Sequence, residues 1–392
     1  MLAVFDRLYH AVSMNRDQRL RYSIRTFTTV AVALICFVAY PIHAVVEEPS
    51  IEKLLSKLPP PEKLVNAEPP KPVQPDDPAA KDPLGQRTIK QNNQGLVIEA
   101  LDSARKLTVK YPHSFGAQCL YGMIAWENRR FVEAANAFRN ATSINPKAAY
   151  GHYGLALVES SQNHYEGAVF HLKKLTAIDP DSPNLYYQLS ELALRAGHKQ
   201  ESIDYAKKTA AMVPSEWPAW FQLARVQSRA GDRQATLDAL VKAAQVAPDN
   251  ELVLLLAGIA YSELNKFPDA IPPLEKAAKL NPRDFLAQAE LGHCLAIVGQ
   301  TDAAIEHLRK GAHLNSRYPP VWDYLGQVYQ KQGRHPEAIN SFEKATHLSP
   351  KWAKAWEHLA TEYQAAGRAA DAERAADRAR QIGNGPANTK RR

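Results

Sequence analysis

A period of 34 residues runs through the chain from Phe115, and it constrains the fold more than any other feature of the sequence. Eight consecutive windows follow one another without insertion or deletion, and they begin at residues 115, 149, 183, 217, 251, 285, 319 and 353. A fixed period of this length is typical of helix-turn-helix repeats, each of which needs its neighbours to bury an apolar face. The sequence therefore predicts an all-α solenoid of eight repeats over residues 115–386.

Small side chains recur at two positions of every window. The eighth position holds Gly, Ala or Ser, and the twentieth holds Ala, Ser or Thr. Leucine fills the seventh position in six windows, and proline fills the thirty-second position in six. Small residues let two helices cross closely, and proline ends a helix because it cannot donate the next backbone hydrogen bond. These positions predict a helical hairpin in each window, with apolar side chains in its core.

The window that begins at residue 319 shows the whole pattern. It contains Trp322, Leu325, Gly326, Tyr329, Ala338, Phe342, Ala345 and Pro350. This pattern resembles the tetratricopeptide repeat (TPR). The resemblance implies a right-handed superhelical solenoid whose first helices line a concave groove, and in this family the groove binds a segment of another protein.

Features at the edges of the repeats extend the prediction. Ala100 and Pro112 keep the register before the first window, so we expect a leading half-repeat over residues 87–114 with one helix from Leu96 to Lys110. Inside the fifth window, two consecutive prolines at 272 and 273 remove internal hydrogen bonds and should shift or kink the second helix. Residues 387–392 form a basic tail.

An apolar run near the N-terminus predicts a membrane helix. Residues 26–46 contain no Asp, Glu, Lys or Arg and are about as long as a helix needs to cross a bilayer. Arginines crowd the preceding segment, residues 1–25, so the positive-inside rule predicts a cytoplasmic N-terminus and extracytoplasmic, periplasm-like repeats in a single-pass membrane protein. An alternative is cleavage of a signal peptide near Ala44, which would leave a secreted or periplasmic soluble protein.

A proline-rich segment separates the apolar run from the repeats. Nine prolines lie between Lys57 and Pro83, without apolar periodicity. Proline-rich segments favour extended conformations and act as semi-rigid spacers. We therefore expect residues 47–86 to be a disordered linker that holds the repeats away from a membrane.

The resemblance also indicates which residues face the groove, at window positions 2, 5, 9, 12 and 13. In the first four repeats these positions hold the aromatic residues Trp126, Tyr150, Tyr153, Tyr187 and Phe221, and the charged residues Glu191, Arg195, Arg225 and Arg229. Aromatic side chains would anchor apolar groups of a partner, and the arginines would bind an acidic side chain or a C-terminal carboxylate. The alternative is that Glu191 pairs with the neighbouring arginines and that the aromatic rings stack between repeats.

Charge and motifs argue against two other classes of function. The formal net charge is +7, of which +3 lies before residue 26 and +3 in the last three residues, so about one net charge remains for the rest of the chain and we expect no nucleic-acid partner. No catalytic motif, phosphate-binding loop or metal-ligand spacing is present, and we expect no enzyme activity, no cofactor and no metal. Cys36 lies in the apolar N-terminal run, and Cys119 and Cys294 lie in the first helices of repeats one and six, beyond the reach of a disulfide, so we expect no intramolecular bridge.

The sequence thus predicts a membrane-anchored scaffold for protein–protein interaction, whose groove binds an extended peptide or helix of a partner in cell-envelope assembly or trafficking. One alternative is a passive spacer or oligomerisation module of an envelope complex. A second alternative is a soluble secreted or periplasmic repeat protein, which would follow from signal cleavage. The oligomeric state stays open at this point.

Overall fold

The computed structural model describes residues 50–58 and 77–383. These residues form helices joined by short loops, and no strand occurs among them, so the all-α prediction is confirmed for this part of the chain. The segments predicted as cytoplasmic (1–25), membrane-spanning (26–46) and basic tail (387–392) lie outside the described residues. Within the described residues, no helix combines the length and the apolar character needed to cross a bilayer.

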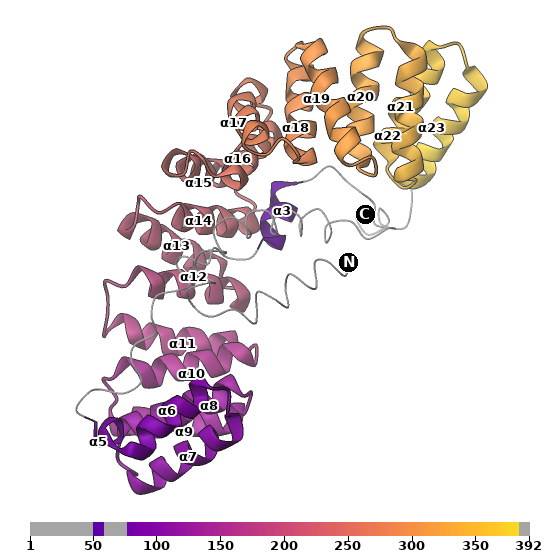
Figure 1. Cartoon of the computed structure of the whole chain (residues 1–392). Helices are drawn as coiled ribbons and strands as arrows, with labels where there is room; N and C mark the ends of the chain where they lie inside the picture. Colours follow the sequence, from indigo (N-terminus) through magenta and orange to yellow (C-terminus); the bar gives the residue numbers. More distant parts are fainter. Residues whose placement is uncertain (1–49, 59–76, 384–392) are drawn as a thin grey trace, which may run out of the picture. The chain divides into compact units, whose positions relative to one another are not determined.

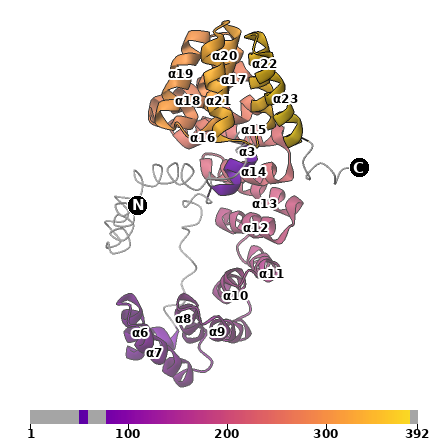
Figure 2. The ribbon, with the colours of Figure 1, turned by 90° about the vertical axis from the view of Figure 1, so that its right-hand side faces the viewer.

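The chain divides into two compact units, which we call the N-terminal unit (residues 60–231) and the C-terminal unit (residues 1–59 and 232–392). Helices of each unit stack as successive pairs (Figures 1 and 2). The N-terminal unit contains α5 (Pro78–Lys81), α6 (Pro83–Asn93), α7 (Val97–Lys110), α8 (Phe115–Glu127), α9 (Phe131–Ile144), α10 (Ala149–Ser161), α11 (Tyr165–Thr176), α12 (Pro183–Ala196), α13 (Lys199–Met212) and α14 (Trp217–Ala230). The C-terminal unit contains α3 (Ile51–Lys57), α15 (Arg233–Val246), α16 (Glu251–Glu263), α17 (Phe267–Leu280), α18 (Phe285–Ile297), α19 (Thr301–Leu314), α20 (Pro319–Lys331), α21 (His335–Leu348), α22 (Ala353–Ala365) and α23 (Ala369–Gly383).

The helices keep the period of the sequence. The first helix of each repeat begins at the first residue of its window, from Phe115 to Ala353, and the second helix begins at the seventeenth. Between them, the fifteenth residue always has a positive φ angle. This position holds five glycines, two asparagines and one arginine: Gly197, Gly231, Gly299, Gly333, Gly367, Asn163, Asn265 and Arg129. A left-handed residue at the end of the first helix turns the chain back, and glycine adopts it without strain.

The small residue at the eighth position is required by the helix crossing within each hairpin. A Cβ atom added at Gly122 would lie 2.8 Å from the ring of Phe138, and one added at Gly326 would lie 2.5 Å from the ring of Phe342. Both rings are fully buried on second helices. The prediction that small residues permit close crossing is therefore confirmed at these glycines.

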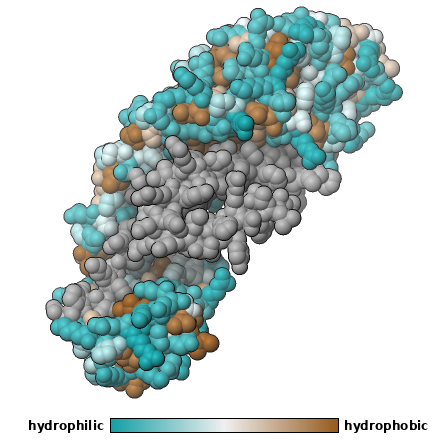
Figure 3. Space-filling model, viewed as in Figure 1, coloured by the Kyte–Doolittle hydropathy of each residue, from teal (hydrophilic) through white to brown (hydrophobic). Residues whose placement is uncertain are grey.

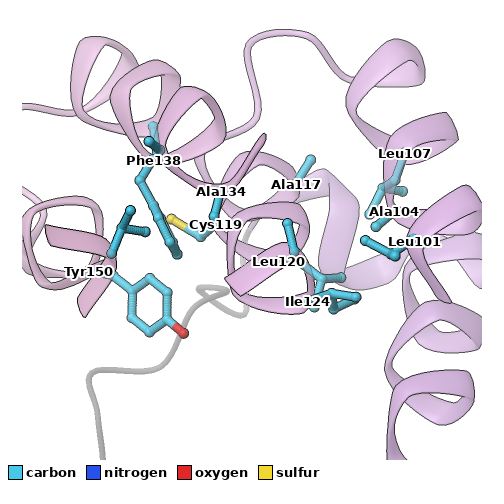
Figure 4. Packing of buried hydrophobic residues seen from close by; sticks show 14 of the residues in the cluster. Leu101, Ala104, Leu107, Ala117, Cys119, Leu120, Ile124, Ala134, Phe138 and Tyr150 are labelled. Carbon is cyan, nitrogen blue, oxygen red and sulfur yellow. The ribbon is translucent and has the colours of Figure 1, made fainter. Parts of the chain in front are cut away.

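Each repeat also packs against the next, as the first hairpins of the N-terminal unit show. In Figure 4, Leu101 and Leu107 of α7 lie on one side of α8, and Phe138 of α9 and Tyr150 of α10 lie on the other. These side chains expose at most 8% of their surface and belong to one buried cluster. The apolar core is therefore continuous from one hairpin to its neighbours, as a repeat array requires.

The predicted half-repeat before residue 115 is a complete hairpin. Helix α7 agrees with the expected helix, but α6 precedes it and packs against it as its partner. Asp82 caps α6 by accepting a hydrogen bond from the backbone N–H of Leu84, and its carboxylate also binds Lys110 and Tyr111. The side chains that α6 buries include Thr88 and Gln91, so polar residues concealed the helical pattern in the sequence.

The prediction of a disordered linker over residues 47–86 is wrong at both of its ends. Residues Ile51–Lys57 form α3, and α5 and the start of α6 occupy the last part of the segment. Proline does not prevent this, because Pro78 and Pro83 stand in the first turn of their helices, where no backbone donor is needed. The rest of the predicted linker, residues 59–76, lies outside the described residues.

The two internal prolines of α17 do not shift the helix. It begins at the seventeenth residue of its window, like the other second helices, and continues without interruption through Pro272 and Pro273. Both prolines lie outside the buried face of the helix, which includes Ala270 and Leu274. The backbone carbonyls that lose their donors can therefore bind water, and the apolar packing retains the helix.

Candidate protein-binding site

The nine residues predicted to face a groove all lie on first helices of the N-terminal unit. Helix α8 carries Trp126, α10 carries Tyr150 and Tyr153, α12 carries Tyr187, Glu191 and Arg195, and α14 carries Phe221, Arg225 and Arg229. The structure brings three of the charged residues into contact and separates the aromatic residues into buried and partly exposed groups.

Three of the predicted aromatic anchors are buried in the packing between repeats. Tyr150, Tyr187 and Phe221 expose 2%, 1% and 1% of their surface. The ring of Tyr150 lies 6.3 Å from that of Phe138, and the ring of Phe221 lies 5.8 Å from that of Trp217 in an edge-on contact. These three rings are therefore core residues rather than surface anchors.

Two of the predicted aromatic residues remain partly exposed. Trp126 donates a hydrogen bond from its indole Nε1 to the hydroxyl of Ser161 at 2.9 Å, which joins α8 to α10. Tyr153 packs against Tyr150 with ring centroids 6.2 Å apart. Their exposed edges lie on successive first helices and are available to an apolar side chain.

The charged residues form a junction between α12 and α14, which we call the Glu191 junction and which consists of Glu191, Arg195, Gln222 and Arg225. Arg225 donates from Nη1 to Glu191 Oε2 at 3.1 Å and to Gln222 Oε1 at 2.8 Å. Arg195 donates from Nε to the other oxygen, Glu191 Oε1, at 3.0 Å. Gln222 donates from Nε2 to Glu191 Oε2 at 3.3 Å. The Glu191 carboxylate therefore binds side chains from both helices.

The local sequence positions these side chains. Helices α12 and α14 both have proline in the first turn, and both end at a glycine in the left-handed conformation, Gly197 and Gly231. The resulting helices have the same length, 14 residues. Residues at equal window positions, such as Glu191 and Arg225, consequently face one another across the repeat boundary.

The charge state of the junction follows from its partners. Burial alone would raise the pKa of Glu191, but the charge of Arg225 and the hydrogen bond from Arg195 outweigh it and hold that pKa below its usual value. Glu191 is therefore ionised at neutral pH. The side chains of Glu191 and Arg225 expose only 15% and 8% of their surface, whereas that of Arg195 exposes 48%. The guanidinium of Arg195 also lies 5.8 Å from the centre of the Tyr165 ring.

Positive charge is in excess at this place. Arg229 follows Arg225 by one helical turn and is exposed, and it makes no ion pair with a described residue. Two arginines thus share the single carboxylate of Glu191, and the third, Arg229, lies one turn further along α14. An anion approaching the first-helix face here would meet one buried, compensated arginine and two arginines that solvent can reach.

Polar atoms without a partner accompany the charged residues. Among the described residues, the hydroxyls of Tyr150 and Tyr187 and the Nε of Arg225 are buried and form no hydrogen bond. Burial raises the pKa of both phenols, so they stay neutral and can donate. A buried donor without an acceptor is costly, and an additional hydrogen-bonding group would be favourable at each of them.

The described residues do not form a metal site or a reactive thiol. No group of three or more His, Cys, Asp or Glu side chains within residues 50–58 and 77–383 could hold a metal ion. Cys119 and Cys294 are buried free thiols, and burial raises the pKa of Cys294 to about 12. A thiol that is neutral and inaccessible is a packing residue rather than a nucleophile. The surface in Figure 3 is mostly hydrophilic, with scattered hydrophobic side chains.

Two polar sites of the C-terminal unit were not anticipated from the sequence. Glu263, at the end of α16, accepts a hydrogen bond from the backbone N–H of Ile51 in α3. Glu251 and Asp284 form an acidic pair at the N-termini of α16 and α18. Glu263 occupies window position 13, one of the positions assigned to a groove, and this register was the available signal. The acidic pair had no signal, because it joins the first and last residues of one window, which lie far apart in the sequence.

Family models support the repeat assignment. Residues 119–183, 255–319 and 319–352 match models described as tetratricopeptide repeats. The chain therefore contains these repeats, and the resemblance noted in the sequence is confirmed there. Repeats of this kind mediate protein–protein interaction through extended surfaces. No curated protein sequence gives a significant match to the chain.

Several solved structures superpose on parts of this chain, among them those of MamA, YrrB and PilW. A crystal structure of MamA is 26% identical, covers 42% of this chain and 96% of its own, and superposes with a TM-score of 0.38. YrrB, a TPR protein whose title mentions an unusual peptide-binding site, is 19% identical, covers 47% of this chain and 95% of its own, and has a TM-score of 0.43. PilW, a type IV pilus biogenesis factor, is 19% identical, covers 52% and 94%, and has a TM-score of 0.44.

Proposed function

We propose that this chain, which carries tetratricopeptide repeats, is a membrane-anchored scaffold whose N-terminal unit binds an acidic segment of a partner protein. The observation that carries the proposal is the Glu191 junction, where arginines of two successive first helices outnumber the single carboxylate between them. The function is binding rather than catalysis.

The junction favours an acidic ligand because its own carboxylate is already saturated. Arg225 and Arg195 each use one hydrogen bond on Glu191, and a guanidinium has five N–H donors. Arg195 and Arg229 can therefore donate hydrogen bonds to a carboxylate of a ligand without breaking an existing pair. An Asp or Glu side chain, or a C-terminal carboxylate, would form charge-assisted hydrogen bonds with them.

The partly exposed rings of Trp126 and Tyr153 extend the surface toward the N-terminal side. Both lie on first helices, as do Arg195 and Arg229. A partner segment that crosses these helices would place an apolar side chain near the rings and an acidic group near the arginines.

Residues 26–46 supply the proposed membrane anchor. Their length and lack of charge support it, and the arginines before them support a cytoplasmic N-terminus with repeats on the other side. This placement directs the scaffold to partners in cell-envelope assembly or trafficking. Cleavage near Ala44 would produce the same repeats as a soluble protein, and immunoblotting of membrane and soluble fractions would distinguish the two.

The binding proposal can be tested with displayed peptides. A library of short peptides is selected on the purified full-length chain, and the affinity of enriched peptides is measured by fluorescence anisotropy. We expect enriched peptides to contain Asp or Glu, and we expect Arg229→Glu to weaken their binding by about tenfold, more at low salt than at high salt. Arg195→Gln should weaken binding less, because it removes a charge without reversing it.

Lys207→Glu is the matched control, because it makes the same change of charge at an exposed position on the second helix α13. Its binding should remain within about twofold of the native chain. Arg225 is left unchanged because it is buried and paired. Equal weakening by Arg229→Glu and Lys207→Glu, or enrichment of peptides without acidic residues, would remove the Glu191 junction as the binding site and would favour a passive structural role.

A further inference from the structure

The C-terminal unit holds a helix of the chain's own N-terminal region. Helix α3 (Ile51–Lys57, indigo in Figure 1) contacts α16, the first helix of the fifth repeat, although about 200 residues separate them in the sequence. The backbone N–H of Ile51 donates a hydrogen bond to the carboxylate of Glu263 on α16.

Helix α3 is strongly amphipathic. Its aliphatic side chains recur at the spacing of one helix face and are buried, with exposed fractions of 4%, 6%, 2% and 3% for Ile51, Leu54, Leu55 and Leu58. Every residue between them, namely Glu52, Lys53, Ser56 and Lys57, is exposed. All aliphatic residues of this segment are thus buried, and all its polar residues are exposed.

A helix of seven residues is not stable by itself in water, because nucleation costs more than so few hydrogen bonds return. Its own cap, the hydrogen bond from Lys53 N–H to Ser50 Oγ, is exposed and adds little. The helical conformation of residues 51–57 therefore depends on docking. A segment that folds only when docked, and that is tethered to its site by the chain, is an internal ligand.

The receiving surface recognises general features of a helix. Glu263 binds a main-chain N–H, which almost any residue can supply. On the same helix, Leu255 and Ile259 occupy groove positions of the window and are buried. Burial raises the pKa of the Glu263 carboxyl, although the Ile51 N–H and Arg233 oppose this effect. Specificity then comes from the spacing of the aliphatic residues that enter the site.

We infer that the first-helix face of α16 is a docking site for short amphipathic helices of partner proteins, with large aliphatic residues at positions 1, 4, 5 and 8, and that α3 fills it as an internal competitor. A partner helix of this spacing binds by displacing α3. The inference concerns a different unit and a different ligand chemistry from the acidic segment proposed above, so either can fail without the other.

The test uses a labelled peptide with the sequence of residues 48–58 and the full-length chain. In the native chain α3 competes with the peptide, whereas Leu55→Asp removes α3 from the site. We expect the peptide to bind the Leu55→Asp chain at least about tenfold more tightly than the native chain in fluorescence anisotropy. Ser56→Asp introduces the same residue on the exposed face and should behave like the native chain.

Two further variants locate the binding site. In the Leu55→Asp background, Glu263→Gln should weaken peptide binding several-fold, because a neutral acceptor replaces the carboxylate. Glu275→Gln changes an exposed carboxylate on α17 and should have no effect. A peptide that itself carries Leu55→Asp should not bind any of the chains.

A measurement on the native chain covers the case in which Leu55→Asp disturbs folding. Hydrogen exchange of residues 51–57 should accelerate when excess unlabelled peptide is added, because displaced α3 unfolds. Equal peptide binding by the native and Leu55→Asp chains, absence of binding to both, or unchanged exchange would overturn the inference. A dimer of the native chain that Leu55→Asp converts to monomer would also overturn it, since α3 would then dock on a second copy.

Discussion

Arg225 and Glu191 are 34 residues apart, one full repeat, and the guanidinium of the first donates to the carboxylate of the second at 3.1 Å. The same window position thus carries opposite charges on successive first helices. Since both side chains are largely buried, removal of either one would leave the charge of the other buried with fewer partners.

Replacement of Arg225 should therefore lower stability. Arg225→Met leaves the Glu191 carboxylate in a largely buried position with fewer partners, and we expect the free energy of unfolding to fall by about 1–3 kcal/mol. Arg229→Met, one turn away and exposed, should change it by no more than about 0.5 kcal/mol. Urea unfolding followed by circular dichroism compares the two variants, and equal midpoints would show that the ion pair contributes no stability.

Helix crossing at the seventh repeat predicts a second effect. A Cβ atom at Gly326 would lie 2.5 Å from the Phe342 ring, which is fully buried and cannot move away freely. Gly326→Ala should therefore destabilise the protein, and Gly326→Leu should do so by about 1–3 kcal/mol or more. Gly383→Ala is the control, because nothing lies within 4 Å of an added Cβ there. Melting temperatures report the difference, and an unchanged value for Gly326→Leu would mean that this crossing is misassigned.

The acidic pair in the C-terminal unit predicts a dependence on pH. Burial raises the pKa of Glu251 to about 7, despite a hydrogen bond from Asn281, and burial also raises the pKa of Asp284. A carboxyl group with a raised pKa favours the folded state while it is protonated, and this contribution is lost as the pH rises through the raised pKa. The free energy of unfolding should therefore decrease as the pH rises from about 5 to about 8.

Glu251→Gln removes the titration and keeps an acceptor for Asn281. Relative to the native chain, this variant should gain about 1–2 kcal/mol of unfolding free energy between pH 5 and pH 8, a range reduced from the full pKa shift because Glu251 is only partly buried. Glu275→Gln, an exposed change on α17, should follow the native chain at both pH values. Parallel pH profiles for Glu251→Gln and the native chain would rule out the effect.

Much of the fold could be predicted because it depends on periodic local rules. Gly326 and Phe342 occupy fixed window positions, and the chemistry of a close crossing restricts both. Each helix begins where the period places it. The handedness of the complete array stays a prediction, since the structure establishes each of the two units by itself.

The candidate site could be predicted only in part. The register correctly placed Glu191 beside Arg225, and the alternative that Glu191 pairs with its neighbours is confirmed. The register could not separate exposed from buried aromatic residues, because Tyr153 and Tyr187 share a window position but differ in burial. Burial at that position is set by contacts with neighbouring repeats, which the sequence of a single window does not contain.

Helix α3 lay beyond such reasoning for a different reason. Its aliphatic spacing spans only two helical turns and has no second copy in the sequence to reinforce it. A short amphipathic segment beside many prolines is typical of a linker, and its contact with α16 joins residues far apart in the sequence. Non-local docking of this kind carries no period that a search along the chain could detect.

The hydrogen bond between Ile51 and Glu263 has a consequence for how a docked helix is aligned and how it is selected. Because the donor belongs to the main chain, the hydrogen bond to Glu263 fixes the position of the first residue of a docked helix and does not depend on the side chain of that residue. The buried aliphatic side chains of the helix determine which helix is bound. Any residue except proline can supply that N–H, so membership of a partner family would be decided by large aliphatic side chains at positions 1, 4, 5 and 8 of the helix and by the intervals between them.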